Sequence, residues 1–501
     1  MEKSKQQTFR IGTRGSLLAV TQSEITKNLL ESETGLKFEI KTIKTQGDII
    51  TDKPLWQLEG KDFFTKELDA NLLEKNIDLV IHSYKDLGSE RPEGIKLGCI
   101  TKRFYPHDIL LIKKSTVNKI PNLETFIVGT SSPRRITNLE AGLHEFLPHF
   151  HGKVEAKNLR GNVNTRIEKL LNDDYHAITL AFAGLERLAH KEDSKKVLEE
   201  LVKDLTFMIL PVKEFPPAAS QGALALETHE ENTFLQQELA KISDQTTIEE
   251  IQREREAFQS YGGGCHLAVG VFVRKLQNYF IHFHKGQVDG KQINVKKLEG
   301  VDYSPLKGKS VYYLFRDFDF LVEKKATDYK TDDSNIFVTS SHCIGSVEDY
   351  NTLWAAGNRT MKKLASKGLW VCGSSEGFGH QEIVEFQKSK LLQIFLKDSK
   401  WEVLSHDQAQ SEVGPCNPAY TREIREVNDQ RVELMLDAEV IYWSSDFQYK
   451  TYTQKYPELK NKIHTCGLGK TFKKLTKMGV EVTPVIDMTH LKELTKDDHE
   501  L

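Results

Sequence analysis

The sequence predicts a multi-domain α/β protein, on the basis of three observations. The chain has 501 residues, so about two to four domains are expected rather than one hydrophobic core. Short β-branched or apolar runs alternate with helical patterns from the start, which is typical of sheets covered by helices. The hydrophobic fraction of 39% and the charged fraction of 28% are ordinary for a globular protein.

Charge and cysteine usage exclude several classes of function. The 69 Lys and Arg residues nearly balance the 72 Asp and Glu residues, so no overall basic field favours nucleic acid. The N-terminal MEKSKQQTFR has no apolar core, and no later stretch is long and apolar enough to span a bilayer. Neither export nor a membrane location is therefore expected. The six cysteines show no CxxC or Cys/His metal spacing. We expect reduced thiols, no metal and a cytoplasmic location; the sequence leaves the oligomeric state open, with a monomer favoured.

The first half alternates strands with helices. Strands are expected at 9–13, 38–45, 78–82, 109–112, 125–128 and 177–180, and helices at 16–30, 65–75 and 164–172. A heavily charged helical stretch covers 232–259 and leads to the loop YGGGC, and strand-like segments then run from 268 to about 297. In folds of this kind, ligands bind at the C-terminal ends of the strands.

The second half carries a faint internal repeat after a linker with the sequence GVDYSPLKGK. In each copy a strand (336–341, then 440–445) precedes a helical segment (357–368, then 467–479). Both segments have Thr, then Leu four residues later and Gly eight residues later, as a capped amphipathic helix requires. Two similar α/β lobes around a cleft are expected; the alternative is a chance likeness of two ordinary helices.

Arginines in the first half lie where strands should give way to helices or loops: Arg14, Arg134, Arg135, Arg160, Arg166 and Arg187. Arginine binds carboxylates in a bidentate manner, and helix N-termini add amide donors. Hydroxyl groups lie at the same ends, on Ser16, Thr130, Ser131 and Ser132. The group suits a small substrate with several carboxylates, although a single arginine is more commonly a solvated or structural charge.

Two further residues could carry chemistry. Asp86 closes the sequence HSYKD directly after a predicted strand, where a carboxylate could stabilise a developing cation or exchange a proton. An Asp at that place is more often a turn or cap residue. Cys265 follows three glycines, which leave space around a thiol. The alternative for Cys265 is a buried small hydrophobe.

The first 270 or so residues closely resemble the hydroxymethylbilane synthase family, also called porphobilinogen deaminase. The matching stretches, in order, are IGTRGS, KTQGD, GKDFFTKELDANLL, DLVIHSYKD, VGTSSPRR, LRGNVNTR, AFAGLERL, ASQGALALE and GGGC. The resemblance implies two periplasmic-binding-protein-like α/β lobes and a small α+β domain. Lobe 1 is expected at 1–106 plus 207–229, lobe 2 at 107–206, the small domain with Cys265 at 230–300, and a linker at 301–309.

The same resemblance implies a chemistry and its residues. Cys265 would carry a dipyrromethane cofactor through a thioether, and Asp86 would hold pyrrole N–H groups and stabilise a cationic azafulvene. Four porphobilinogen molecules would condense with release of ammonia, giving hydroxymethylbilane for heme biosynthesis. The other implied cofactor contacts are Lys85, Arg134, Arg135 and Ser131. The implied substrate contacts are Arg14, Ser16, Arg160, Arg166, Arg187, Lys61, Lys66 and Phe64.

The sequence departs from the family pattern at three places, none of which removes a residue assigned to chemistry. Gly88 stands where the family usually has proline, which could loosen the segment after Asp86. His107 stands where arginine is common, so a contact between domains is expected to differ. Pro133 precedes the arginine pair and fits the start of a helix.

Residues 310–501 resemble uroporphyrinogen-III synthase more diffusely, through TSS, GNRT, WSS and HTCGLGKT in the right order. The resemblance implies a two-lobed α/β domain, a lyase that cyclises hydroxymethylbilane to uroporphyrinogen III. Such chemistry depends on holding a folded substrate more than on a strong acid or base. The candidate contacts are Ser340, Thr360, Ser444 and Thr471, with Tyr420 as an aid to water loss.

Two alternatives stay open beside a bifunctional enzyme. The second half could be a non-catalytic domain kept for stability, which would leave a monofunctional synthase. The arginine-rich lobes would also suit a carboxylate-binding receptor, which would form no covalent adduct.

Overall fold

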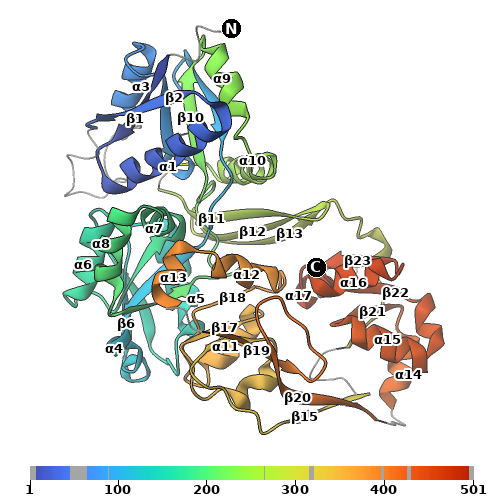
Figure 1. The fold of residues 1–501 in the computed structure, drawn as a ribbon. Coiled ribbons are helices and arrows are strands. Elements are labelled where there is room, and N and C mark those ends of the chain that lie inside the picture. The colour runs from blue at the N-terminus through green and yellow to red at the C-terminus, as the bar shows by residue number, and fades with distance from the viewer. Residues whose placement is uncertain are drawn as a thin grey trace.

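The computed structural model describes residues 7–45, 65–88, 90–264, 266–314, 321–396, 400–425 and 430–495. Five β-sheets with flanking helices make up this part of the chain, so the expected mixed α/β class is confirmed (Figure 1). None of the helices within these ranges is long and apolar enough to cross a membrane.

The first sheet has the strand order β2-β1-β3-β10-β4. Strand β1 pairs in parallel with β2 and β3, whereas β10 returns from far along the chain and lies antiparallel between β3 and β4. We call this sheet, with its helices, lobe 1. Its elements are β1 (Thr8–Arg14), α1 (Leu17–Thr34), β2 (Lys37–Ile43), α3 (Lys66–Leu73), β3 (Leu79–Ser83), β4 (Ile95–Ile100), β10 (Leu224–His229) and α9 (Thr233–Ala240).

The second sheet has the order β7-β6-β8-β5-β9 and forms what we call lobe 2. Strand β5 lies antiparallel between β8 and β9, and β6 pairs in parallel with β7 and β8. The expected boundary after residue 206 falls inside β9, whose hydrogen bonds to β5 keep the whole strand in lobe 2. Its elements are β5 (Asp108–Lys113), α4 (Lys114–Val117), β6 (Thr125–Gly129), α5 (Pro133–Gly142), β7 (Lys153–Lys157), α6 (Val163–Leu171), β8 (Ala177–Ala181), α7 (Phe182–Ala189), α8 (Glu192–Val202) and β9 (Leu205–Ile209).

The expected helical stretch at 232–259 is two helices. The first ends at Ala240, and Asp244 begins the second, because its carboxylate accepts a hydrogen bond from the Thr247 amide at the start of α10 (Gln245–Ser260). Leu235 and Leu239 of α9 belong to the core of lobe 1. Helix α10 instead packs on the antiparallel meander β11 (Ala268–Leu276), β12 (Tyr279–Val288) and β13 (Lys291–Glu299). We call α10 with this meander the small domain.

One buried carboxylate joins the small domain to the lobes. Glu254 of α10 is fully buried and forms a two-pronged ion pair with Arg103, at 2.8 and 3.0 Å. Its oxygens also accept from the amides of Ser220, at 2.7 Å, and Val273, at 2.9 Å. Because every oxygen has a donor, the burial of this charge is offset, and three distant segments are held at one point.

Residues 310–495, which we call the C-terminal region, contain the other two sheets. The first, in the order β14-β21-β22-β23, is wholly parallel, and each strand is short. Its elements are β14 (Val311–Leu314), α14 (Gln430–Asp437), β21 (Val440–Trp443), α15 (Asp446–Lys455), β22 (Ile463–Gly467), α16 (Lys470–Lys477), β23 (Val482–Val485) and α17 (Met488–Thr495).

The second sheet of the C-terminal region has the order β15-β20-β19-β16-β17-β18, and only the β15–β20 pair is antiparallel. Its elements are β15 (Val322–Ala326), β16 (Asn335–Val338), β17 (Thr352–Ala355), α11 (Asn358–Ala365), β18 (Gly373–Ser374), α12 (Gln381–Gln387), α13 (Lys390–Leu396), β19 (Trp401–His406) and β20 (Cys416–Ile424). The two expected repeat helices are thus α11 and α16.

Lobe 2 and the six-stranded sheet share one hydrophobic core. A single cluster of buried side chains includes Phe126 and Phe207 of lobe 2 together with Phe337 and Trp354 of the C-terminal region. At the edge of the sheets, the Ile209 amide donates to the Cys372 carbonyl at 2.7 Å. The C-terminal region is therefore packed on lobe 2, with lobe 1 on the far side of the molecule (Figure 1).

Candidate functional site

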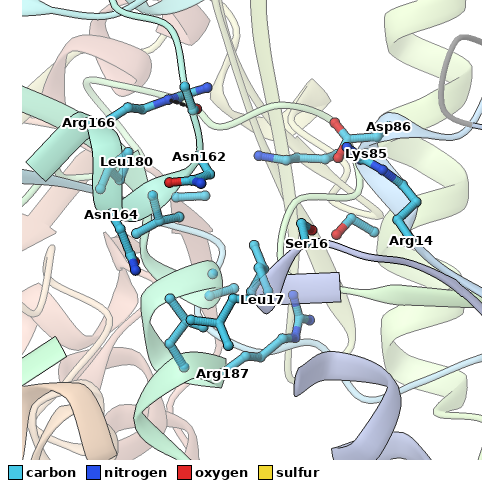
Figure 2. Close-up of a pocket in the computed structure, with 18 of the residues that line it drawn as sticks. Arg14, Ser16, Leu17, Lys85, Asp86, Asn162, Asn164, Arg166, Leu180 and Arg187 are labelled. Atoms are coloured by element: carbon cyan, nitrogen blue, oxygen red, sulfur yellow. Dashed lines mark hydrogen bonds between the residues drawn. The ribbon is translucent and has the colours of Figure 1, made fainter. Parts of the chain in front are cut away.

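A cavity of about 660 Å³ lies between lobes 1 and 2, within the range of about 300–1,000 Å³ usual for small-molecule sites. It opens where β1, β3 and β8 end and where α1, α6 and α7 begin. Seven basic side chains from both lobes line it, against one acidic side chain among the described residues: Arg14, Lys44, Lys85, Arg135, Arg160, Arg166 and Arg187, with Asp86 (Figure 2). The excess of cations makes the cavity a receptor for anions.

Lobe 1 supplies Arg14 and Ser16 from the turn between β1 and α1. Arg14 is the last residue of β1, and Ser16 is the N-cap of α1, where its hydroxyl accepts from the Ala19 amide at 3.3 Å. The cap fixes the start of the helix, so the free amides of its first turn face the cavity beside the guanidinium of Arg14.

Lys85 and Asp86 follow β3 in a single helical turn. Lys85 extends into the cavity (Figure 2). It donates to the side-chain oxygen of Gln221 at 3.2 Å. Burial lowers the pKa of Lys85 to about 8; the nearby Asp86 opposes that change, and Arg135 adds to it. The Asp86 carboxylate is exposed at the cavity wall, where a ligand can reach it.

Lobe 2 contributes Arg135 from the first turn of α5. The buried Asp108 carboxylate accepts from Arg135 at 2.6 Å and from Arg134 at 2.8 Å. Burial alone would raise the pKa of Asp108, but the two guanidinium groups outweigh it and lower that pKa. The Nε of Arg135 is buried and has no hydrogen-bond partner among the described residues, so it keeps one donor for a ligand.

Three more arginines complete the wall of lobe 2. Arg166 donates to the Gly161 carbonyl at 2.7 Å, and its pKa is lowered to about 10 by burial and by the neighbouring arginines. Arg187 donates to the Gly222 carbonyl at 2.7 Å and stacks over Phe104; burial lowers its pKa to about 10. Arg160 lies half-buried beside them on the same wall.

Three of the expected contacts lie outside the cavity lining. Arg134 is turned inward, and besides Asp108 it donates to the Pro216 carbonyl at 2.9 Å. The Ser131 hydroxyl donates to the Asn158 side chain and the Leu159 carbonyl. Lys66 is exposed at the start of α3. In this structure Arg134 and Ser131 stabilise the loops behind the wall rather than form its surface.

Lys61, Phe64 and Cys265 lie outside the described residues. The three glycines before Cys265 have φ values of +105°, +61° and +98°, which side chains rarely adopt, so this loop requires glycine. Helix α10, which leads into the loop, is tied to the segment after Asp86, because Arg255 donates to the carbonyls of Leu87 and Gly88 at 3.2 and 3.0 Å.

The sequence analysis missed five lining residues with polar side chains: Lys44, Ser83, Asn162, Asn164 and Gln221. Asn162 could have been found as the N-cap of α6, where its side chain accepts from the Thr165 amide at 3.0 Å. Gln221 lies in the family-matching stretch ASQGALALE, but the stretch alone did not indicate its role, which depends on contacts with residues far along the chain. Its amide nitrogen donates to Asp108 at 2.9 Å while its oxygen accepts from Lys85.

A buried cluster of Asp69, His82 and Glu227 has the composition of a metal site, with ligand atoms within 4.8 Å of one another. Arg91 fills it instead, donating to Asp69 at 2.6 Å and to both oxygens of Glu227 at 2.7 and 2.8 Å. The arginine compensates the two carboxylates, as a cation would.

In the C-terminal region, the expected contacts fall into two groups. Ser340 is a buried helix cap that follows β16, Tyr420 is buried in β20, and Thr360 is half-buried on α11. Ser444 and Thr471 lie together at the ends of the parallel strands, since the Thr471 hydroxyl donates to the Ser444 carbonyl at 3.2 Å. The two sheets meet nearby: a Cβ on Gly469 would lie 2.7 Å from the Gly377 carbonyl.

Comparison with known proteins identifies the N-terminal part of the chain. The family model "Porphobilinogen deaminase, dipyromethane cofactor binding domain" matches residues 9–237. A probable porphobilinogen deaminase of Pyrobaculum islandicum is 36% identical over 296 residues, which cover 59% of this chain and 92% of the relative. The chain belongs to the porphobilinogen deaminase family.

A second family member, the porphobilinogen deaminase of Francisella tularensis subsp. novicida, is 36% identical over 298 residues, or 59% of this chain and 92% of that protein. Among solved structures, a polar amino acid ABC uptake transporter substrate-binding protein from Streptococcus thermophilus is 14% identical, with a TM-score of 0.26 over 52% of this chain and 83% of that one. A score at that level does not establish a common fold.

The matching family model is described as a dipyrromethane cofactor binding domain, so a dipyrromethane is the group to be compared with the cavity. By the resemblance, such a group carries acetate and propionate side chains and pyrrole N–H groups. The basic lining and the unpartnered Nε of Arg135 suit the carboxylates, while the single carboxylate, Asp86, suits the N–H groups. The residues present therefore fit the cofactor.

We expect the lowered pKa of Lys85 to be measurable by its reactivity. Only the neutral amine reacts with acetic anhydride, so trace labelling of Lys85 in the folded protein should reach half its maximum near pH 8. In the urea-unfolded chain, which serves as the control, the midpoint should return to about 10.4. Because the unfolded state binds this proton more tightly, stability should rise with pH between these two values. A folded-state midpoint near the unfolded one would contradict the expectation.

Proposed function

We propose that the N-terminal part of the chain is a hydroxymethylbilane synthase of heme biosynthesis, a transferase that condenses four porphobilinogen molecules and releases ammonia. Family membership supports this proposal. The observation that carries it is the cavity between the lobes, where seven basic side chains surround one carboxylate. Porphobilinogen bears an acetate and a propionate group, so a growing chain adds two negative charges with each unit.

We infer that Asp86 is the catalytic residue. In each condensation, the bond from the aminomethyl carbon to nitrogen breaks, ammonia leaves, and positive charge develops on the pyrrole of the substrate. The carboxylate of Asp86 would accept the pyrrole N–H and balance that charge. A carbon–carbon bond then forms at the free α-carbon of the bound chain, which loses its proton.

The basic residues would bind and orient the carboxylates. Arg14 and Lys85 act from lobe 1, and Arg135, Arg160, Arg166 and Arg187 act from lobe 2. The guanidinium groups of Arg135, Arg166 and Arg187 are fixed before substrate arrives, because Asp108, Gly161 and Gly222 respectively already hold them. Such preorganisation lowers the entropic cost of aligning the reacting carbons. Ser16, Ser131, Arg134, Lys61, Lys66 and Phe64 stay in the proposal as family-implied contacts.

The cofactor would be attached to Cys265. When bound, the dipyrromethane supplies the pyrrole α-carbon at which the first unit is added. In support, Arg255 of α10, the helix that precedes the GGGC sequence, is bound to the segment after Asp86. The proposed division into lobe 1, lobe 2 and a cofactor-carrying domain follows from the same family resemblance. The cytoplasmic location and the monomeric state stay predictions from the sequence.

For the C-terminal region, we propose the uroporphyrinogen-III synthase reaction, in which hydroxymethylbilane loses water and closes with inversion of its last ring. The support is the pair of α/β sheets whose strand ends meet near Gly377 and Gly469. Ser444 and Thr471 lie at those strand ends, where α/β proteins bind ligands. Ser340, Thr360 and Tyr420 are the further candidates.

The attachment of the cofactor can be tested by intact mass. Chain purified from a porphobilinogen-producing host should be heavier than its sequence by one dipyrromethane, and Cys265→Ala should abolish the increment because the thioether sulfur is gone. Cys416→Ala, which removes a half-buried cysteine of the C-terminal region, is the matched control and should keep it. Unmodified wild-type chain would contradict the proposal.

The role of Asp86 can be tested by Asp86→Asn. The amide is isosteric but cannot balance a cation, so kcat for ammonia release should fall by about 10²–10⁴-fold with little change in thermal stability. The control is Asp193→Asn, which changes an exposed carboxylate on α8 remote from the cavity lining. Near-normal turnover of Asp86→Asn would remove the residue from the proposed chemistry.

The second activity can be tested by the product formed from porphobilinogen alone. If both regions are active, the chain should give mainly the type III isomer of uroporphyrinogen. Spontaneous closure gives type I, so mainly type I product would refute the cyclase proposal and leave the deaminase proposal standing. Double substitution of Ser444 and Thr471 by alanine should shift an active chain from type III towards type I.

A further inference from the structure

Two short segments connect lobes 1 and 2. The chain leaves β4 of lobe 1 and enters β5 of lobe 2 through residues 101–107, and it returns from β9 to β10 through residues 210–223. We call these the first and second crossovers. Together the two crossovers form the hinge between the lobes. Any change in the angle between the lobes must bend both crossovers, and it changes the width of the cavity.

The C-terminal region holds the first crossover through an aromatic cluster. The Tyr105 hydroxyl donates to the Glu385 carbonyl at 2.8 Å, and its ring stacks on Phe386 with centroids 5.8 Å apart. The His107 ring meets Phe386 edge-on at 5.4 Å. His107 is the position where the sequence departs from the family, so a difference in a domain contact was expected there. In this chain its contacts include the C-terminal region.

Glu376 of the C-terminal region touches both crossovers at once. Its two oxygens accept from the amides of Val212 and Lys213 on the second crossover, each at 2.9 Å. The same carboxylate lies 3.5 Å from Nε2 of His107 on the first crossover. The side chain is only 5% exposed, so these contacts are shielded from water.

The backbone at Glu376 is shaped for this contact. Its φ of +51° lies in the left-handed region that side chains rarely adopt. The Ser374 hydroxyl accepts from the Glu376 amide at 3.2 Å and stabilises the turn after β18. A costly conformation of this kind persists where the surroundings fix it, and here it directs the carboxylate out of its own sheet.

Residues on or next to the crossovers determine the positions of side chains that line the cavity. Asp108 directly follows His107 and fixes Arg135. Gln221, on the second crossover, donates to the Pro106 carbonyl at 2.7 Å and to Asp108, and accepts from Lys85. A displaced crossover would therefore move cavity-lining cations of both lobes.

A second contact fixes lobe 2 to the C-terminal region beside the same wall. The buried Glu186 carboxylate accepts from the Ser389 hydroxyl and from the amides of Lys390 and Leu391 at the start of α13. The next residue, Arg187, lines the cavity. Lobe 2 is thus fixed to the C-terminal region at α7 as well as through the crossovers.

We propose that Glu376 is a positioning residue of the deaminase site: by holding both crossovers, it sets the angle between the lobes and the fit of the basic wall to substrate. This inference rests on the proposed deaminase function, and it gives the C-terminal region a part in the first reaction whether or not that region catalyses the second. A merely stabilising contact would change the unfolding temperature without changing how substrate is bound.

The test compares full-length wild type, Glu376→Gln and Glu376→Asp with the control Glu402→Gln. Glu402 is a half-buried glutamate of β19 whose partners, Tyr329 and Asn417, both lie in the C-terminal region. The amide of Glu376→Gln keeps one acceptor and faces the second backbone N–H with a donor. KM for porphobilinogen should rise about tenfold with a smaller change in kcat, since binding depends on hinge geometry and Asp86 is untouched.

Glu376→Asp retains the charge on a shorter stem and should give an intermediate KM. Unfolding temperature is measured for every variant, and a KM like that of Glu402→Gln would overturn the inference. If the Glu376 variants do not fold, Tyr105→Phe decides the question, because it removes one hydrogen bond from the first crossover. A rise in KM of about threefold would support the inference, and an unchanged KM would refute it. An inactive wild type would instead overturn the proposed function itself.

Discussion

The ion pairs of Asp108 determine the arrangement of the cavity. This carboxylate is 1% exposed and binds Arg134, Arg135 and the amide of Gln221. Removing one partner from a buried charge pair typically costs about 3–5 kcal/mol, because the remaining charges stay away from water. The starts of β5 and α5 and the second crossover must therefore meet at one point, and both lobes and the hinge are built around it.

Asp108 pairs with Arg134 and Arg135, but the cavity lining still has seven basic side chains and only one carboxylate, Asp86, among the described residues. Burial lowers the pKa of Lys85 to about 8 and that of Arg166 to about 10, and nearby arginines act in the same direction on both. The free protein thus holds cations close together in a partly dry space, at a cost in stability. A ligand with several carboxylates removes that repulsion, so the free energy of binding includes relief of the strain. This is why a polyanionic substrate, rather than a neutral one, fits the site.

The sequence predicted the elements well where periodicity and caps decide them, and predicted the site only in part. The strands at 9–13, 109–112 and 177–180 correspond to β1, β5 and β8, because each is a short apolar run between clear turn signals. Arg134 and Arg135 could not be separated, since neighbouring residues in a helix point in directions about 100° apart and only packing decides which faces the cavity. Gln221 escaped for a related reason: its partners, Lys85 and Asp108, are more than a hundred residues away.

The contact between Glu376 and the crossovers could not be predicted from the sequence either, because its partners are also more than a hundred residues away. This contact changes the interpretation of the C-terminal region. The sequence analysis treated that region either as a second enzyme or as a stabilising domain, with each half complete in itself. Yet Glu376 binds the hinge of the deaminase lobes, and the next residue, Gly377, lies where the two C-terminal sheets meet at Gly469. Consecutive residues of one constrained turn cannot move independently. The turn that contacts the hinge therefore also lies where the two C-terminal sheets meet, which a division into two separate halves does not capture.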